Sequence, residues 1–261
     1  MDLYLKDKVF IVTGGAKGIG EAIVLELARE GAMPVIAGRS REVGEALAAR
    51  ILDQGGRCLN IHVELSEAGA CERVVEETLE AFGSIQGLVN NAGVNDGAGL
   101  EKGSPAAFRR SVSTNLMHYY DMAFHALESL KRSRGSIVNI SSKTALTGQG
   151  GTSGYAASKG AQLALTREWA LELARYGIRV NAIVPAEVWT PLYEKWIATL
   201  PNPEETLARI TGRIPLGQRM TTSEEIAAMA VFLLSERSSH TTGQWIVVDG
   251  GYVHFDRAYE P

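Results

Sequence analysis

The sequence predicts a single-domain α/β fold built around a parallel sheet. Two observations carry the prediction: short apolar, β-branched runs alternate with longer amphipathic stretches, and the first run ends in a glycine-rich turn. Strands that alternate with helices of this length form βαβ units with right-handed crossovers. The 261 residues, 45% of them hydrophobic, are enough for one large core, and no linker-like or repetitive segment divides the chain.

Seven segments have the composition of buried strands, and they are residues 9–12, 33–37, 59–63, 87–90, 136–140, 179–184 and 245–248. Between them, apolar residues recur at helical spacing in residues 20–31, 66–82, 105–131, 155–176 and 222–234. Residues 187–220, with several prolines and two tryptophans, are longer than a plain crossover needs, so we expect a substrate loop there. The tail at 252–261 is too short for another βα unit, and we expect it on the surface or against a neighbouring subunit.

Charge and composition argue against several classes of partner. The net charge is −4, from 26 basic and 30 acidic residues without a long run of either sign, so neither nucleic acid nor an anionic membrane is the expected partner. No window approaches the roughly 20 apolar residues of a membrane span, and no signal peptide is recognisable. The only cysteines, Cys58 and Cys71, give no disulfide framework. A reducing, cytoplasmic location and no metal site are the expectation.

The first strand runs into TGGAKGIG, which contains Gly14, Gly18, Ile19 and Gly20 at the start of a helix. Backbone amides at a helix N-terminus, without side chains in front of them, can approach a pyrophosphate and meet it with the positive end of the helix dipole. A glycine trio alone is weak evidence, but its place between a strand and a helix favours a dinucleotide site.

The second strand is followed by Gly38-Arg39, where NAD enzymes commonly carry an acid for the ribose 2′-hydroxyl. Arg39 and Lys17, the cation inside the glycine turn, could bind a 2′-phosphate instead. Two cations without a carboxylate favour NADP, with NAD possible. The alternatives are that both are solvated surface charges, or that Arg39 stacks on adenine.

The ends of the third and fourth strands supply further candidates for cofactor binding. Glu64, followed by Leu65, could receive the adenine amino group, and NNAG places Asn91 and Gly93 beside the cofactor. Strand ends on one edge of an open α/β sheet line the crevice where ligands bind.

The strongest signal for chemistry is YAASK, in which Tyr155 and Lys159 share one helix face. A tyrosine of pKa about 10 is a poor base at neutral pH, and we expect the lysine ammonium to lower that pKa. Tyr155 can then exchange a proton with an alcohol or carbonyl as hydride moves. Ser142 can hold the substrate oxygen beside it. Asn115 could bend its helix and hold a water that connects Lys159 to solvent.

These motifs, in this order, resemble the short-chain dehydrogenase/reductase family over residues 7–251. The resemblance implies a Rossmann fold with a seven-stranded parallel sheet and helices on both faces, an Asn-Ser-Tyr-Lys tetrad (Asn115, Ser142, Tyr155 and Lys159) and a homotetramer. Tyr155 and Lys159 are also expected to contact the cofactor.

The segment after the sixth strand resembles the same family with one departure. Pro185-Ala186 stands where the family commonly reads Pro-Gly. The resemblance implies that backbone groups of Val188 bind the nicotinamide carboxamide and that Thr190 contacts amide or phosphate. Alanine does not readily adopt φ > 0, so this turn should have an ordinary conformation.

Polar and aromatic residues are expected around the substrate. Lys143 follows Ser142, Gln149 precedes Tyr155, and Glu187 and Trp196 lie in the predicted substrate loop. Buried Lys143 and Glu187 must either pair with each other or bind a polyhydroxylated ligand, and a structural ion pair at the rim is the alternative.

Several stretches, including NISSKTALTGQG and VDGGYVHFDRA, resemble those family members that oxidise L-fucose. This implies a sugar substrate, oxidised at C1 to a lactone. The alternatives are a 3-oxoacyl-carrier-protein reductase, another alcohol dehydrogenase with an apolar substrate, and a non-catalytic cofactor-sensing scaffold. No basic docking patch supports the first, Lys143 and Glu187 disfavour the second, and intact Ser142, Tyr155 and Lys159 disfavour the third.

Overall fold

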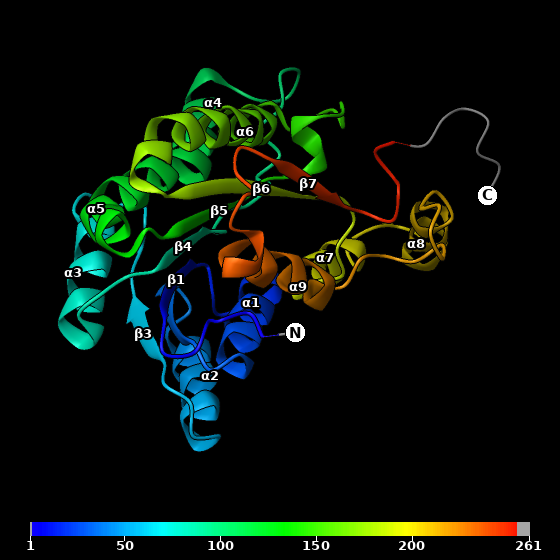
Figure 1. Ribbon diagram of the computed structural model, residues 1–261. Coiled ribbons are helices and arrows are strands. Elements are labelled where there is room, and N and C mark those ends of the chain that lie inside the picture. The colour runs from blue at the N-terminus through cyan, green and yellow to red at the C-terminus, as the bar shows by residue number, and fades with distance from the viewer. Residues whose placement is uncertain (1, 255–261) are drawn as a thin grey trace.

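Seven parallel strands form one sheet in the computed structural model, which describes residues 2–254 (Figure 1). Their order is β3-β2-β1-β4-β5-β6-β7. The strands are β1 (Val9–Thr13), β2 (Met33–Gly38), β3 (Leu59–His62), β4 (Gly87–Asn90), β5 (Ser136–Ile140), β6 (Arg179–Pro185) and β7 (Trp245–Val248). All seven predicted strands are present, with ends that differ by at most one residue. The predicted α/β fold with a parallel sheet is confirmed.

Helices flank the sheet on both faces. They are α1 (Gly18–Arg29), α2 (Arg41–Asp53), α3 (Ala70–Phe82), α4 (Pro105–Val112), α5 (His118–Ser133), α6 (Ser153–Leu173), α7 (Pro191–Ile197), α8 (Pro203–Thr211) and α9 (Ser223–Leu234). Short helical turns are η1 (Ser113–Met117), η2 (Lys143–Ala145), η3 (Ala174–Tyr176) and η4 (Glu236–Ser238). Of these helices, α2, α7 and α8 were not among the predicted helical ranges.

The core has two halves because the buried strands place alternate side chains on opposite faces. On one face, Phe10 and Val12 of β1 pack with α1, α2 and α9. On the other face, Val9 and Ile11 pack with α3, α5 and α6. Figure 1 shows the two layers of helices on opposite sides of the sheet.

The ligand-binding edge of the sheet follows from its strand order. The chain builds β1, β2 and β3 outward in one direction, then returns to place β4 on the other side of β1. The connections after β1 and β4 therefore diverge and leave a crevice at the carboxyl ends of these strands.

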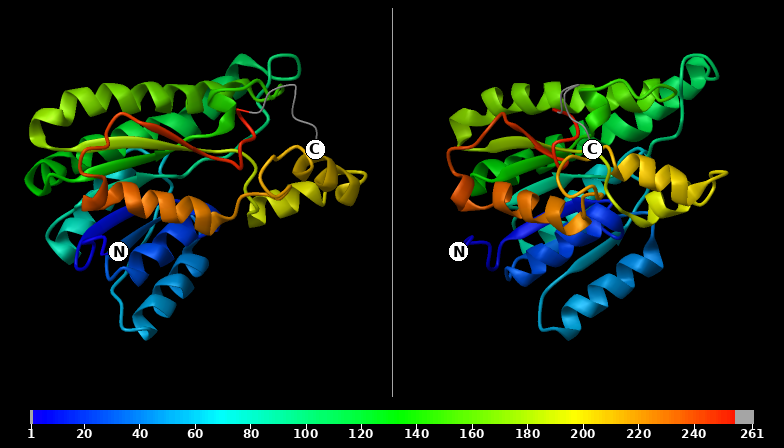
Figure 2. Two further views of the ribbon diagram at one scale, coloured as in Figure 1. Left: turned by 45° about the vertical axis from the view of Figure 1, so that its right-hand side comes forward. Right: turned by 90° about the vertical axis from the view of Figure 1, so that its right-hand side faces the viewer.

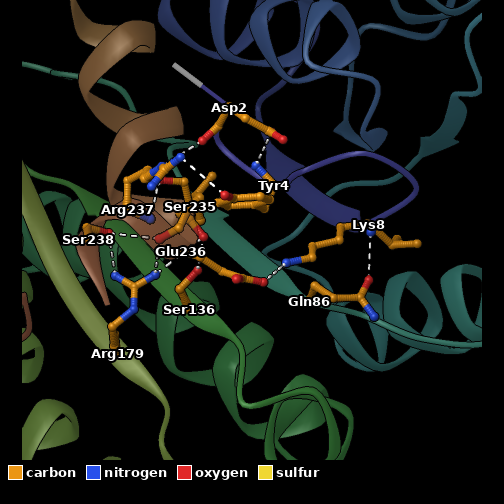
Figure 3. A network of polar contacts seen from close by, with 12 residues as sticks. Asp2, Tyr4, Lys8, Gln86, Ser136, Arg179, Ser235, Glu236, Arg237 and Ser238 are labelled. Carbon is orange, nitrogen blue, oxygen red and sulfur yellow. Dashed lines mark hydrogen bonds and ion pairs between the residues drawn. The ribbon is translucent and has the colours of Figure 1, made fainter. Parts of the chain in front are cut away.

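The opposite edge, where strands begin, is closed by a polar network around the chain's first residues (Figure 3). Arg179, at the start of β6, donates hydrogen bonds to the Leu233 carbonyl and the Ser238 hydroxyl, both at 2.7 Å. The Arg237 guanidinium donates to the Asp2 carbonyl at 2.7 Å. These hydrogen bonds hold the end of α9 and the N-terminal segment against the edge where the strands begin. Because this edge is covered, we expect a substrate site at the edge where the strands end.

The predicted helix at 105–131 is interrupted in the structure. Between α4 and α5 lies η1, a π-helical turn that contains Asn115. The predicted substrate loop at 187–220 contains α7 and α8 instead of irregular chain, and these helices project from the body beside the C-terminal segment (Figure 2). Each begins with a proline in its first turn, where the missing N–H costs nothing.

Of the tail predicted at 252–261, residues 255–261 lie outside the described residues. Within residues 2–254, no helix combines the length and the apolar character that crossing a bilayer requires.

Candidate active site

A cleft of about 540 Å³ opens at the carboxyl ends of the strands. It is lined by residues that follow six different strands, from the glycine turn after β1 to Pro185 at the end of β6. The predicted residues in its lining are Gly14, Lys17, Gly18, Ile19, Arg39, Glu64, Leu65, Asn91, Gly93, Ser142, Tyr155, Lys159, Val188 and Thr190. One cleft therefore brings together most of the candidate cofactor and catalytic residues.

The glycine turn is shaped by contacts that leave no room for side chains. Gly14 and Gly18 have φ of 65° and 56°, which glycine adopts without strain. A Cβ at Gly20 would overlap the Gly14 carbonyl and lie 2.7 Å from Asn91 Nδ2. Asn91 Nδ2 in turn donates to the Thr13 carbonyl at 2.9 Å, so Asn91 fixes the turn from below.

The turn after β2 differs from the sequence-based expectation. Arg39 Nη1 lies 3.3 Å from Glu64 Oε2, because β2 and β3 are neighbours in the sheet. Ser66 also donates to Glu64, from its amide at 3.2 Å and its hydroxyl at 2.8 Å. Burial raises the pKa of Glu64, but the hydrogen bonds from Ser66 and the charge of Arg39 outweigh it and lower that pKa. Glu64 therefore partly neutralises Arg39, a contact that the sequence did not reveal, and the preference for NADP stays a prediction.

Tyr155 and Lys159 come from the first turns of α6 and line the cleft beside Ser142, which follows β5. The Ser142 hydroxyl lies near enough to the Tyr155 phenol to lower the pKa of Tyr155. The ammonium of Lys159 lies 5.5 Å from the centroid of the Tyr155 ring and donates to the Ile140 carbonyl at 2.7 Å. A hydroxyl, a phenol and an ammonium thus converge at one point of the cleft.

The pKa values of this group do not follow the expectation that Lys159 lowers the pKa of Tyr155. Burial raises the pKa of Tyr155, and the nearby Ser142 hydroxyl lowers it by less. Burial also lowers the pKa of Lys159 to about 7, since the charged ammonium loses solvation. The two groups therefore need further interactions if the phenolate and the ammonium are to exist together.

Asn115 is fully buried in η1 and is held on both sides of its amide. Its Oδ1 accepts from the Val94 amide at 2.7 Å and its Nδ2 donates to the Ser111 carbonyl at 2.9 Å. Its backbone carbonyl accepts from Gln162 Nε2 at 2.8 Å. A Cβ at Gly93 would lie 3.0 Å from Asn115 Oδ1 and 3.7 Å from Lys159 Nζ. The helix irregularity expected at Asn115 is present, whereas its role toward a water stays a prediction.

Lys143 and Glu187 form an ion pair next to Ser142. Their side chains are 11% and 10% exposed, so the pair is largely buried. Glu187 Oε2 also accepts from the Tyr193 hydroxyl at 2.8 Å, and Lys143 Nζ lies 4.6 Å from the Tyr252 ring centroid. Burial lowers the pKa of Lys143. The cluster of Lys143, Glu187, Tyr193 and Tyr252, called the polar cluster below, connects β5, β6, α7 and the C-terminal segment.

The remaining substrate candidates lie farther out. Gln149 is exposed, and Trp196 is 47% exposed with its ring edge-on to Tyr193 at a centroid distance of 5.0 Å. Within the described chain, neither residue lines the cleft, and Lys143 and Glu187 lie just behind its lining. Their roles stay predictions.

Three residues were missed by sequence reasoning. Tyr193 lines the cleft from α7, and burial raises its pKa to about 12. His118 lines the cleft from α5, where burial and then the charge of Lys159 lower its pKa to about 4. Tyr119 is fully buried behind Lys159. The signal for His118 and Tyr119 was their position three and four residues after Asn115.

The residues present fit a nicotinamide dinucleotide. Gly14 and Gly93 line the cleft together with Gly18 and Ile19, the first residues of α1, and a Cβ at Gly14 or Gly93 would crowd the neighbouring backbone or the Asn115 side chain. This combination suits a pyrophosphate at one end and a ribose near Lys159 at the other. Among residues 2–254, no group of three or more potential ligands is arranged for a metal ion.

Comparisons with known proteins agree with this geometry. A family model described as enoyl-(acyl carrier protein) reductase matches residues 14–253. The L-fucose dehydrogenase of Mus musculus is 39% identical over 94% of this chain and 88% of its own length. The 3-oxoacyl-[acyl-carrier-protein] reductase of Thermotoga maritima is 36% identical over 95% of this chain and 99% of its own length. The crystal structure of Cj0485 dehydrogenase superimposes with a TM-score of 0.94, at 49% identity and 99% coverage of both chains.

Proposed function

The chain belongs to the short-chain dehydrogenase/reductase family of NAD(P)-dependent oxidoreductases, and on that premise we propose that it oxidises an aldose such as L-fucose at C1 to the lactone. The observation that carries the proposal is the polar cluster beside Ser142. Lys143 and Glu187 pair with each other, and Glu187 also accepts from Tyr193, which lines the cleft. Two largely buried charges behind this end of the cleft suit a ligand with hydroxyl groups better than an apolar chain.

Glu187 retains hydrogen-bonding capacity although it is already paired. A carboxylate offers about four acceptor positions, and Lys143 and Tyr193 occupy two of them. The rest can accept hydroxyl hydrogen bonds from a sugar. Lys143 has further protons, and Trp189 and Trp196 on the adjoining helix segment are 40% and 47% exposed, which offers flat surfaces for a pyranose ring.

The chain's own residues have distinct roles in the proposed reaction. Ser142 holds the C1 hydroxyl, and Tyr155 as a phenolate accepts its proton. Lys159 stabilises the phenolate and binds the ribose. A nicotinamide held in the cleft would supply the hydride acceptor, and loss of the hydroxyl proton to Tyr155 and of the hydride from C1 would leave the C1 carbonyl of the lactone. Asn115 fixes η1 and with it the helix that packs behind Lys159.

For the cofactor we propose NADP, with NAD as the alternative. Lys17 lines the cleft and Arg39 is 70% exposed, so both can reach a 2′-phosphate. The Glu64 carboxylate reduces this preference, because it competes with the phosphate for Arg39.

Assembly into a homotetramer is part of the same proposal. Met117 at the end of η1 and Tyr120 and Phe124 on α5 are 51%, 52% and 60% exposed. The Tyr120 ring lies 6.4 Å from the buried Trp169 ring of α6, centroid to centroid, so a second helix supports this face. Exposed apolar faces of this kind mark subunit contacts. Light scattering on a size-exclusion column should give four times the chain mass of 28.1 kDa.

The test is a panel of substrates with both cofactors. Formation of reduced nicotinamide is followed by absorbance with L-fucose, other aldoses and long-chain alcohols, and the lactone is identified by NMR. Reduction of a 3-oxoacyl thioester tests the second candidate, which the relative from Thermotoga maritima favours. Tyr155→Phe serves as the control, since it should bind cofactor but turn over less than a few per cent as fast. Oxidation of long-chain alcohols without oxidation of any aldose would refute the proposed substrate class.

A further inference from the structure

Lys159 lies between two tyrosines from different helices. Its Nζ is 5.5 Å from the ring centroid of Tyr155 on α6 and 5.5 Å from that of Tyr119 on α5. Tyr155 lines the cleft, whereas Tyr119 has no exposed surface. The buried tyrosine therefore cannot meet the substrate, but it can act on the lysine.

Three polar atoms form a closed set behind Lys159. Lys159 Nζ donates to the Ile140 carbonyl at 2.7 Å and to the Tyr119 hydroxyl at 3.3 Å. The Tyr119 hydroxyl donates its own proton to the same Ile140 carbonyl at 3.0 Å. Because that proton is committed, the Tyr119 oxygen can only accept toward Lys159.

We propose that Tyr119 is a positioning residue that keeps the Lys159 ammonium charged and directs it into the cleft. The inference rests on the proposed role of Tyr155 and Lys159. An ammonium has three N–H donors, and two of them are directed to buried acceptors. The third is left for the cleft side, where Tyr155 and the cofactor ribose are expected.

The electrostatic surroundings give this contact its importance. Burial lowers the pKa of Lys159 to about 7, so its charged and neutral forms have similar populations near neutral pH. The Tyr119 oxygen accepts a hydrogen bond from the ammonium and therefore increases the population of the charged form. Burial raises the pKa of Tyr119, which therefore stays a neutral phenol. The other titratable groups around Lys159 are Tyr155 and His118. The pKa of His118 is lowered to about 4, so its imidazole is neutral there, and the pKa of Tyr155 is raised, so the phenolate that the proposed reaction needs depends on the charge of Lys159.

Tyr119→Phe removes the hydroxyl that accepts from Lys159 and donates to the Ile140 carbonyl, and Tyr120→Phe, the 52% exposed neighbour on the same helix, is the matched control. We expect the pKa of Lys159 to fall by about one unit, the effect of one charge-assisted hydrogen bond. In the pH profile of kcat/KM for oxidation, the alkaline limb should move down by about one unit. The loss should be about tenfold at pH 8 and small at pH 5.5, with the sugar KM unchanged and the cofactor KM raised.

A second measurement needs neither substrate nor cofactor. Competitive acetylation with acetic anhydride, read by peptide mass spectrometry, gives the pH at which Lys159 becomes nucleophilic. This midpoint should fall by about one unit in Tyr119→Phe and stay unchanged in Tyr120→Phe. An unchanged midpoint, or an activity loss equal at all pH values, would overturn the proposal. Failure of the wild-type protein to oxidise an aldose would count against the proposed function but would leave the acetylation result valid.

Discussion

Removal of the Glu187 carboxylate is the perturbation that best separates a structural ion pair from a sugar-binding group. In Glu187→Ala, Lys143 loses its ion-pair partner and Tyr193 loses the acceptor at 2.8 Å. Both members of the pair are about nine-tenths buried, so little water can replace the lost contacts. Breaking a buried pair from one side costs about 3–5 kcal/mol, and we expect about 3 kcal/mol because some solvent reaches the site.

A double-mutant cycle measures the coupling free energy between Lys143 and Glu187. Lys143→Met removes the ammonium and keeps an apolar stem of similar length, so Glu187→Ala combined with Lys143→Met leaves no unpaired charge. The double variant should lose less stability than the two single variants summed, by about 1–3 kcal/mol. Urea unfolding followed by tryptophan fluorescence measures all four free energies, and Glu194→Ala, an exposed change on α7, is the control.

The kinetic half of the experiment tests the sugar. If Glu187 accepts hydroxyl hydrogen bonds, its loss should raise the sugar KM about 10- to 100-fold in the single and the double variant alike, since a hydrogen bond to a charged group contributes about 1.5–3 kcal/mol. The cofactor KM should change little. A double variant with the wild-type sugar KM would show that the pair is only structural and would refute the reasoning.

Three further predictions concern the cofactor and the pH dependence of stability. Arg39→Asp should shift the preference from NADP toward NAD by about 10- to 100-fold in the ratio of kcat/KM values, because a phosphate-binding cation becomes a carboxylate. Wild-type protein that uses NAD equally well would contradict the role of Arg39. Because burial lowers the pKa of His118 to about 4 from the ordinary 6.5, the unfolded chain binds more protons between these values. The free energy of unfolding, from urea titrations, should therefore fall by roughly 3 kcal/mol from pH 6.5 to 4. His118→Phe should lose this slope. Hydrogen bonds from Arg219 and the Thr222 amide lower the pKa of Glu225 to about 2. The ion pair of Glu225 with Arg219 is exposed and should add about 1 kcal/mol to the free energy of unfolding. This contribution should be complete above about pH 4.5 and should vanish near pH 2. Unfolding free energies of wild type and Glu225→Gln should therefore converge at low pH, and a constant difference would exclude the ion pair as its cause.

The strands were predictable because their burial leaves a direct trace in the sequence. Residues Val9–Thr13 are buried on both faces of the sheet and therefore form a continuous apolar run. Tyr155 and Lys159 were predictable because their helical spacing alone brings them to one face. By contrast, α7 and α8 were interpreted as loop because of their prolines. Thr190 followed by Pro191 was in fact a start signal, since the Thr190 hydroxyl caps α7 by accepting from the Tyr193 amide at 3.2 Å.

The contacts that one sequence does not reveal are those made between distant elements. Glu64 meets Arg39 because Gly38 on β2 pairs with His62 on β3, and this register depends on the whole sheet. The spacing of charges along a chain says nothing about which strands become neighbours. The cofactor prediction therefore counted the cations after β1 and β2 and assigned Glu64 to the adenine, but missed its contact with Arg39.

The contact between Tyr119 and Lys159 depends on the π-helical turn at Ser113–Met117. A π turn contains one more residue than an α-helical turn, so every later residue is rotated by roughly 100° relative to an uninterrupted α-helix. Without this rotation, the face of α5 that carries Tyr119 would turn away from β5 and α6. Asn115, whose Oδ1 accepts from the Val94 amide at 2.7 Å, ties the turn to the loop after β4. We therefore expect that Asn115→Ala, which releases this tie, shifts the Lys159 acetylation midpoint in the same direction as Tyr119→Phe. An unchanged midpoint in Asn115→Ala, with a shifted one in Tyr119→Phe, would show that the helix keeps its π turn without Asn115.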